Sequence, residues 1–143
     1  MNILVSACLI GTCCRYDGDH QHNQNVVNLA EKHVLIPICP EQLGGLMTPR
    51  PPAELRNGRV ITNDGIDVTK QFIAGAKAAL DIARLNNCKQ AILKEHSPSC
   101  GCGKIYDGSF SGNLVNGVGI TADLLLQNGI SVIGEKHVDL ESL

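Results

Sequence analysis

Short apolar runs alternate along the chain with stretches of helical periodicity. Residues 3–7 are almost wholly apolar, which predicts a buried parallel strand. Similar runs predict strands at 34–38, 90–94 and 130–133, and Pro37 indicates the end of its strand or a position at the sheet edge. Because strands and helices alternate, the pattern favours an α/β sheet of mainly parallel strands.

Helical patterns lie between these strands. The strongest covers residues 70–86, where apolar positions share one face and Thr69 is a favourable N-cap. Shorter patterns predict helices at 25–32 and 121–127, and Asn128-Gly129 is a typical C-terminal stop. A short helix is also expected in the tail after the last strand. We therefore predict a three-layer, Rossmann-like fold with helices on both sides of the sheet.

Turn signals predict one small insertion in this fold. Residues 59–62 and 66–68 are expected to pair as a β-hairpin across a turn at 63–65. Residues 44–52 are too rich in glycine and proline for a long regular element, and the polar stretch leading to Gly119 shows no regular pattern. No linker or repeat divides the chain, so residues 1–143 are expected to form a single domain.

Composition narrows the classes of function. Hydrophobic residues make up 43% and charged residues 18% of the 143 positions, as in a folded domain. The net charge of −2 argues against a large nucleic acid as partner, and 3% aromatic residues argue against a stacking platform for single strands. The apolar start lacks a basic segment and a cleavage site, and it is too short to span a membrane. We expect a cytoplasmic protein with no membrane partner.

The seven cysteines are the strongest chemical signal. An odd number cannot pair fully in disulfides, and in a cytosolic chain cysteines more often bind metals or take part in catalysis. Cys8 follows the first predicted strand, Cys39 follows the second, and Cys100 lies in the loop after the third. Since the carboxyl ends of parallel strands meet at one edge of a sheet, the three thiols are expected to converge there.

Three separated thiols suit some cofactors better than others. A structural zinc site usually has paired C-x2-C motifs, whereas Cys100 and Cys102 are separated by one residue and no second pair exists. The tandem ferredoxin motif is also absent. A cubane iron–sulfur cluster held by three cysteines would leave one iron open as a Lewis acid. A thiol redox or nucleophile role and inert buried cysteines remain alternatives.

Six sequence motifs, which follow one another along nearly the whole chain, match the motifs of a known protein family in the same order. The sequence resembles the thiouracil desulfidase family, long known only as a domain family of unknown function. The matching motifs are Ser6-Ala7-Cys8-Leu9-Ile10-Gly11, Arg15-Tyr16-Asp17-Gly18, Cys39-Pro40-Glu41-Gln42-Leu43-Gly44-Gly45-Leu46, Thr48-Pro49-Arg50-Pro51-Pro52-Ala53-Glu54, Ser97-Pro98-Ser99-Cys100-Gly101 and Ile105-Tyr106-Asp107-Gly108-Ser109-Phe110.

The resemblance implies a [4Fe–4S] enzyme that removes sulfur from thiolated pyrimidines without net redox change. By position, it implies Cys8, Cys39 and Cys100 as cluster ligands, with one iron not ligated by protein, and Glu41 and Ser97 as residues facing the substrate. The implied partner is a small thiolated nucleobase, nucleoside or nucleotide, and hydrogen sulfide is released. A non-enzymatic iron–sulfur or metal-binding protein and a thiol redox protein are the alternative functions.

Individual roles remain open at this point. Glu41 is expected to activate water or move protons, and Ser97 to contact the substrate or shape a turn. Cys14, where the family often has an apolar residue, is the main rival for a ligand position. Cys102 is expected to lie near the site without a role. Cys13 and Cys88 are expected to be structural residues. One further set is expected either to bind polar parts of the substrate, including a phosphate, or to pin loops together. This set consists of Arg15, Tyr16, Asp17 and Arg50.

Overall fold

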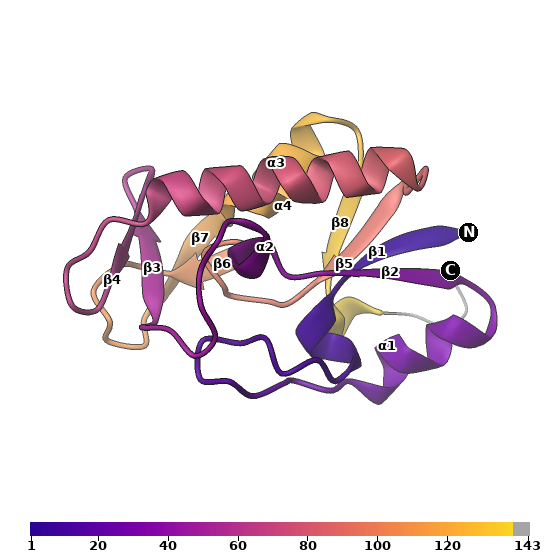
Figure 1. Ribbon diagram of the computed structural model, residues 1–143, viewed down its shortest axis with the longest axis horizontal. Helices are drawn as coiled ribbons and strands as arrows, with labels where there is room; N and C mark the ends of the chain where they lie inside the picture. Colours follow the sequence, from indigo (N-terminus) through magenta and orange to yellow (C-terminus); the bar gives the residue numbers. More distant parts are fainter. Residues whose placement is uncertain (139–143) are drawn as a thin grey trace.

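A parallel sheet forms the centre of the molecule (Figure 1). The computed structural model describes residues 1–138. The four strands are β1 (Asn2–Ser6), β2 (Val34–Ile38), β5 (Gln90–Leu93) and β8 (Ser131–Gly134), ordered β2-β1-β5-β8 with every pairing parallel. All four predicted strands are confirmed, and β2 with its Pro37 lies at an edge of the sheet.

Helices cover both faces of this sheet. The long α3 (Thr69–Leu85) and α4 (Ile120–Gln127) pack on the face that carries Leu4, Ala91 and Leu93. The opposite face, with Ile3, Val5 and Ile92, packs on the segments that flank the sheet on the other side. These are α1 (Gln24–Asn28) and the 3-10 segments η1 (Ala7–Ile10), η2 (Leu29–Glu31) and η3 (Glu135–His137). β1 and β5 are buried on both faces, which explains why they are continuously apolar. The α/β fold with three layers is confirmed.

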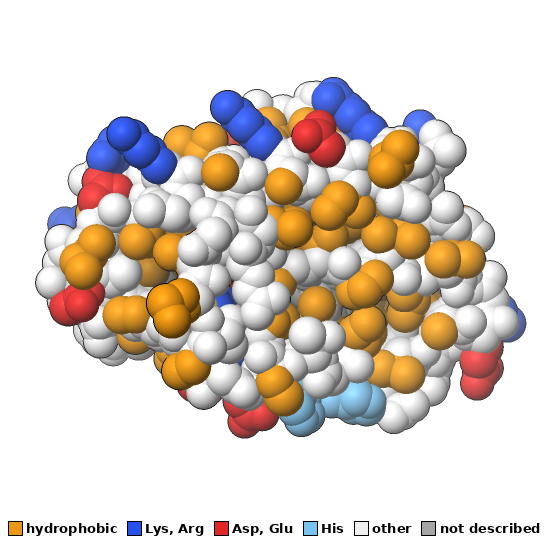
Figure 2. Space-filling view, in the orientation of Figure 1, with side chains coloured by type: hydrophobic (Ala, Val, Ile, Leu, Met, Phe, Trp, Pro, Cys, Tyr) orange, Lys and Arg blue, Asp and Glu red, His pale blue; other side chains and the backbone are white. Residues whose placement is uncertain are grey.

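The exposed surface follows the same arrangement. In Figure 2, Lys and Arg side chains lie along the outer side of α3, and apolar side chains gather between α3 and α1, over β2. β2 contributes Val34, which is exposed because an edge strand has a neighbour on one side alone. The tail helix expected from the sequence is limited to η3 in the described chain, and residues 139–143 lie outside the described residues. In residues 1–138, no helix combines the length and apolarity needed to cross a membrane.

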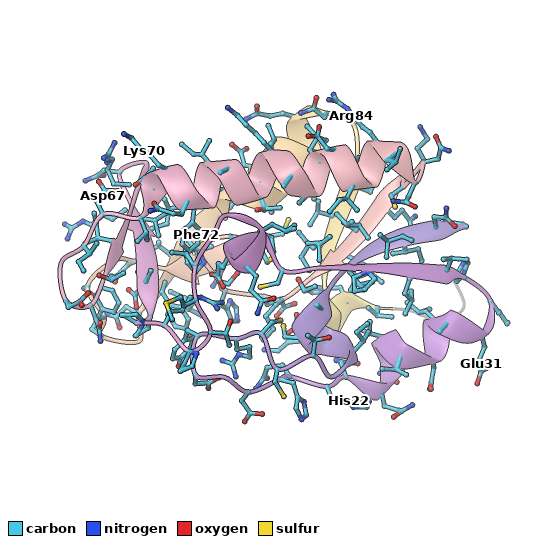
Figure 3. The ribbon with its side chains drawn as sticks, in the orientation of Figure 1. His22, Glu31, Asp67, Lys70, Phe72 and Arg84 are labelled. Carbon is cyan, nitrogen blue, oxygen red and sulfur yellow. The ribbon has the colours of Figure 1, made fainter. Side chains whose placement is uncertain are left out.

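The start of α3 differs from the prediction. Thr69 is the first helical residue, and the N-cap position belongs to Val68. The Thr69 hydroxyl accepts the Val60 N–H at 2.9 Å, so it is used to attach β4 (Arg59–Thr62). The helix is capped instead by Asp67, whose carboxylate accepts the Thr69 N–H at 2.9 Å (Figure 3). Hydrogen bonds from Thr69, followed by the Arg59 guanidinium, lower the pKa of Asp67 to about 2.

The predicted hairpin is also paired differently. β4 (Arg59–Thr62) is a strand, but its antiparallel partner is β3 (Ala53–Arg56), on its N-terminal side. The turn between them is Asn57-Gly58, with φ of 53° and 75°. A two-residue hairpin turn favours positive φ at both positions, and Asn-Gly adopts this turn easily. The expected partner, residues 66–68, forms an isolated bridge to β4 and no strand.

A second hairpin was not predicted. β6 (Cys102–Tyr106) and β7 (Leu114–Val118) pair antiparallel within the polar, glycine-rich stretch before Gly119. Most of their residues are exposed or half-buried, so neither strand has the buried alternating face that a sequence pattern reveals. β3 packs against β6, and the two hairpins lie together at one end of the molecule (Figure 1).

The short helix α2 (Pro40–Leu43) follows β2 directly and crosses α3 at very close range. A Cβ atom at Gly75 in α3 would overlap the Pro40 carbonyl, and one at Gly44 would overlap the Gln71 carbonyl. Glycine at both positions therefore lets the two backbones touch. The contact fixes α2, and with it the residues on either side of the β2–α2 junction.

We expect Gly75→Ala to lower the free energy of unfolding by about 1–3 kcal/mol, because the added methyl group forces α2 away from α3. Helix propensity alone acts in the opposite direction, by about 1 kcal/mol in favour of alanine. Urea denaturation measures the difference. Ala74→Gly, at the exposed neighbouring position, is the control for propensity. A Gly75→Ala variant more stable than the parent would contradict the close approach.

Candidate active site

A cavity of about 530 Å³ lies beyond the carboxyl ends of β1, β2 and β5. Its walls come from the residues that follow these strands, from the loop 44–52 and from the two hairpins. In the sheet, β2 lies on one side of β1 and β5 lies on the other, so the strand order reverses at β1. Open α/β sheets bind ligands at such a switch point, and the cavity lies there. The position agrees with the edge predicted from the sequence.

Four cysteines line this cavity: Cys8, Cys14, Cys39 and Cys100. Cys39 is half-buried and the other three are buried. The Cys14 thiol hydrogen-bonds with those of Cys39 and Cys8, and Cys39 Sγ lies 3.7 Å from the Cys14 carbonyl oxygen. The structure therefore brings together the three thiols expected to converge, and it places Cys14 among them.

The other three cysteines lie away from the cavity. Cys13 is exposed, and Cys88 is buried in the hydrophobic core beside α3 and α4. Cys102 is close in sequence but its Sγ faces the Val132 carbonyl at 3.8 Å, outside the cavity lining. Their positions agree with the expectation that they are not ligands.

The cavity thiols have raised pKa values. Burial raises the pKa of Cys100 to about 12. The hydrogen bond with Cys39 lowers the pKa of Cys14, but the hydrogen bond with Cys8 and burial raise it by more. The net effect is a rise of the Cys14 pKa to about 11. The pKa of Cys39 is raised by its hydrogen bond with Cys14 and by burial. Burial contributes to the raised pKa of all three thiols, as expected for groups at the inner wall of a cavity.

The donor set suits an iron–sulfur cluster. Cysteine sulfurs are soft ligands, which select Zn, Cu(I) and iron–sulfur clusters. Within residues 1–138, no group of three or more His, Cys, Asp or Glu side chains is arranged to hold a single metal ion. The thiols instead surround a cavity much larger than one ion, and they come from separate loops. The residues present therefore fit a multi-iron cluster better than a mononuclear site.

Polar side chains lie directly beside the sulfurs. Glu41, in the first turn of α2, accepts a 3.5 Å hydrogen bond from the buried Ser99 hydroxyl. Ser99 Oγ is 3.3 Å from Ser97 Oγ, and Ser97 Oγ accepts the Cys100 N–H at 2.7 Å. A chain of polar contacts thus links a cysteine loop to a carboxylate. The sequence reasoning missed Ser99, although it lies in the same motif as Ser97.

Arg50 completes this polar chain. Its side chain is only 6% exposed and forms an ion pair with Glu41. The same guanidinium donates to the carbonyl oxygens of Cys14, at 2.9 Å, and Met47, at 3.2 Å, and to Thr48 Oγ1 at 3.0 Å. Of its two expected roles, Arg50 has the contacts of a residue that pins loops together.

The remaining cations of the cavity differ in their partners. Lys94 is committed to an ion pair with Glu135 at 2.7 Å. Arg15 lies 3.7 Å from Asp17 and 5.6 Å from the Tyr16 ring centroid, in the loop that leads away from Cys14. Arg15 and Tyr16 both line the cavity, whereas Asp17 does not.

A thiol-lined cavity at the switch point of a doubly wound sheet, with a carboxylate and hydroxyls beside the sulfurs, is typical of α/β metalloenzymes. Sequence comparison identifies the family of enzymes within this class. Residues 3–137 match the model of the family described as 2-thiouracil desulfurase. The chain belongs to this family, and it is an enzyme that removes sulfur from thiouracil.

Two relatives illustrate the similarity. The chain is 43% identical, over 147 aligned residues, to the uncharacterized protein YbbK of Bacillus subtilis strain 168, covering 96% of this chain and 97% of YbbK. It is also 43% identical to a solved structure of the [4Fe–4S]-dependent thiouracil desulfidase TudS. That match has a TM-score of 0.92 and covers 99% of this chain and 94% of TudS.

Proposed function

We propose that this enzyme is a [4Fe–4S]-dependent hydrolytic desulfidase of small thiolated pyrimidines, as free base, nucleoside or nucleotide. One observation carries the proposal: four cysteine thiols and the Glu41 carboxylate line the same cavity at the switch point. The solved relative, named as [4Fe–4S]-dependent, supports it. Seven free thiols also suit the reducing cytoplasm, which we propose as the location.

The cluster would be held by Cys8, Cys39 and Cys100, each in the segment that follows a different parallel strand, leaving one iron without a protein ligand. When bound, it supplies an open, soft Lewis acid toward the sulfur of a thiocarbonyl group. Cys14 is a further cysteine of the segment that follows β1, and its carbonyl oxygen accepts a hydrogen bond from Cys39 Sγ at 3.7 Å. Its proposed place is beside the cluster, as a neighbour.

Glu41 is the proposed general base and acid. The reaction exchanges sulfur for the oxygen of water: water adds to the thiocarbonyl carbon, and sulfur leaves as hydrogen sulfide. The carboxylate would remove a proton from the water and return one to the departing group. Its two oxygens are held by Ser99 and Arg50, which fixes the direction in which it faces. Proton transfer needs such fixed geometry.

Ser97 is the proposed hydroxyl contact to the pyrimidine. Its oxygen already accepts the Cys100 N–H, so its own hydrogen is the one available for donation. Ser97 lines the cavity together with Ser99, 3.3 Å from it between the two Oγ atoms. A donor at this point is suited to the exocyclic carbonyl oxygen of the substrate, next to the cysteine loop.

Anaerobic reconstitution with iron and sulfide tests the proposal. A brown protein with about four irons and four sulfides per chain is expected, and turnover of 2-thiouracil to uracil plus sulfide should depend on that cluster. A cluster without turnover would indicate a non-enzymatic iron–sulfur protein. Protein that never takes up iron, yet cycles a disulfide, would indicate the thiol redox alternative.

Arg50→Gln is expected to lower kcat about 100-fold, because Glu41 loses the partner that holds its carboxylate, and small displacements are costly in catalysis. Arg50→Lys keeps the charge but not the forked donor geometry, so an intermediate value is expected. Steady-state kinetics with 2-thiouracil and with a thiolated uridine monophosphate measure both variants. If only KM for the phosphorylated substrate rose, Arg50 would be a phosphate ligand, contrary to this role.

A further inference from the structure

The aromatic side chains of this chain are few and share one location. The sequence has two Tyr, two Phe and no Trp, and all four aromatic residues line the cavity. Phe72 is buried and points from α3 toward the hairpins (Figure 3). Tyr16, Tyr106 and Phe110 are 41%, 37% and 39% exposed. Scarce aromatics argue against a nucleic-acid surface, but here they concentrate around a cavity for a small ligand.

Phe110 stands out among them because its backbone is strained. It lies in the loop between β6 and β7 with φ of 56°, a left-handed conformation that a bulky side chain seldom adopts. Such a conformation is unfavourable and persists only where the surroundings impose it. Strain of this kind at the lining of a cavity points to a function for the side chain.

Glu54 is hydrogen-bonded to the backbone of this loop, at Phe110 itself and at Gly108. Its Oε1 accepts the N–H of Gly108 at 3.0 Å and that of Phe110 at 3.1 Å. Glu54 belongs to β3, so one carboxylate oxygen ties the loop of the second hairpin to the first. Gly108 itself has φ of +94°, and a Cβ there would meet the Arg56 side chain. The loop is therefore closely fitted to β3.

We propose that Phe110 stacks on the ring of the pyrimidine substrate and determines specificity for a planar ring, with Glu54 as its positioning residue. This inference rests on the proposed function, because it assigns a contact to the same substrate. Two cations of the cavity, Arg50 and Lys94, are already paired with Glu41 and Glu135. The Phe110 ring at the cavity could therefore recognise the planar ring of the substrate, whereas these two cations are already occupied by carboxylates.

The test compares two substrates that share a thiocarbonyl group. 2-Thiouracil has a planar conjugated ring, whereas 5,6-dihydro-2-thiouracil has a puckered ring with a much smaller π-face. Stacking of a base on an aromatic side chain corresponds to about 5–150-fold in affinity. Phe110→Leu is expected to raise KM for 2-thiouracil within that range and KM for the dihydro compound much less, and Phe110→Tyr should restore the preference.

Glu54 variants test the positioning role. Glu54→Gln keeps an oxygen acceptor for the two N–H groups, so it should retain most of the preference for the planar substrate. Glu54→Ala removes the acceptor and should reproduce the Phe110→Leu result. Iron and sulfide content, and the visible spectrum, should match the parent in all four variants. An equal rise of KM for both substrates, or no rise, would overturn the proposal.

Uracil binding to the cluster-loaded protein separates this inference from the function on which it rests. Calorimetry should show weaker binding of uracil to Phe110→Leu than to the parent. If Phe110→Leu binds uracil more weakly than the parent but the parent does not turn over 2-thiouracil, the proposed function fails and the stacking contact stands. If the parent turns over 2-thiouracil and Phe110→Leu binds uracil as well as the parent does, the stacking contact fails alone.

Discussion

Cys100→Ser is expected to yield a folded protein that holds no intact [4Fe–4S] cluster and has no measurable desulfidase activity. Cys100 is buried, and its backbone N–H is fixed by Ser97, so the loop can keep its shape when sulfur is replaced by oxygen. A serine hydroxyl is a hard, weakly acidic ligand that cannot replace a soft thiolate on iron. Iron and sulfide analysis after anaerobic reconstitution measures the loss. Circular dichroism checks the fold.

Matched variants show whether the loss is specific. Cys8→Ser and Cys39→Ser should behave like Cys100→Ser, whereas Cys13→Ser, at an exposed position, should keep the full cluster. Cys14→Val should also keep it, since Cys14 is proposed as a neighbour. The proposed ligand set would be wrong if Cys14→Val lost the cluster while Cys39→Ser retained it.

Glu41→Gln is expected to lower kcat by about 10²–10⁴-fold while iron and sulfide content stay at the level of the parent. The amide has nearly the same shape as the carboxylate, but it cannot accept a proton from water. Single-turnover kinetics under anaerobic conditions measure the chemical step directly. Glu31→Gln, on the exposed surface of η2, removes the same charge far from the cavity and should leave kcat unchanged.

Two outcomes would contradict the role of Glu41. Full turnover by Glu41→Gln with an intact cluster would exclude proton transfer by this carboxylate. Loss of the cluster in the same variant would mean that Glu41 acts through the cysteine loops, as its contacts with Ser99 and Arg50 permit. Measuring iron and turnover on one sample separates these results from the expected one.

The sheet could be predicted because buried strands have a recognisable hydrophobic pattern in the sequence. β1 is covered on both faces, so residues 3–5 are continuously apolar, and β5 behaves alike at residues 91–93. Once the strands are known to be parallel, their carboxyl ends must share an edge. That geometry alone brought Cys8, Cys39 and Cys100 to one cavity. The predicted single domain over residues 1–143 stays a prediction.

The hairpins and the polar side of the site could not be predicted in the same way. β6 and β7 are mostly exposed and therefore lack a hydrophobic pattern. Thr69 has the residue type of a cap, but a tertiary contact with Val60 takes its hydroxyl. Arg50 and Glu54 act through partners distant in sequence, Cys14 and Phe110 among them, and neither pairing has a local signature. Contacts between separate loops depend on the assembled fold.

The order of the strands also bears on how the enzyme matures during synthesis. Cys8 and Cys39 follow β1 and β2, which can pair as soon as the first forty or so residues have emerged from the ribosome. The third proposed ligand, Cys100, becomes available only after α3 and β5 have been made and β5 has docked on the free side of β1. A nascent chain therefore carries an incomplete ligand set for most of its translation. With the proposed ligand set, insertion of the cluster would therefore follow the docking of β5 on β1.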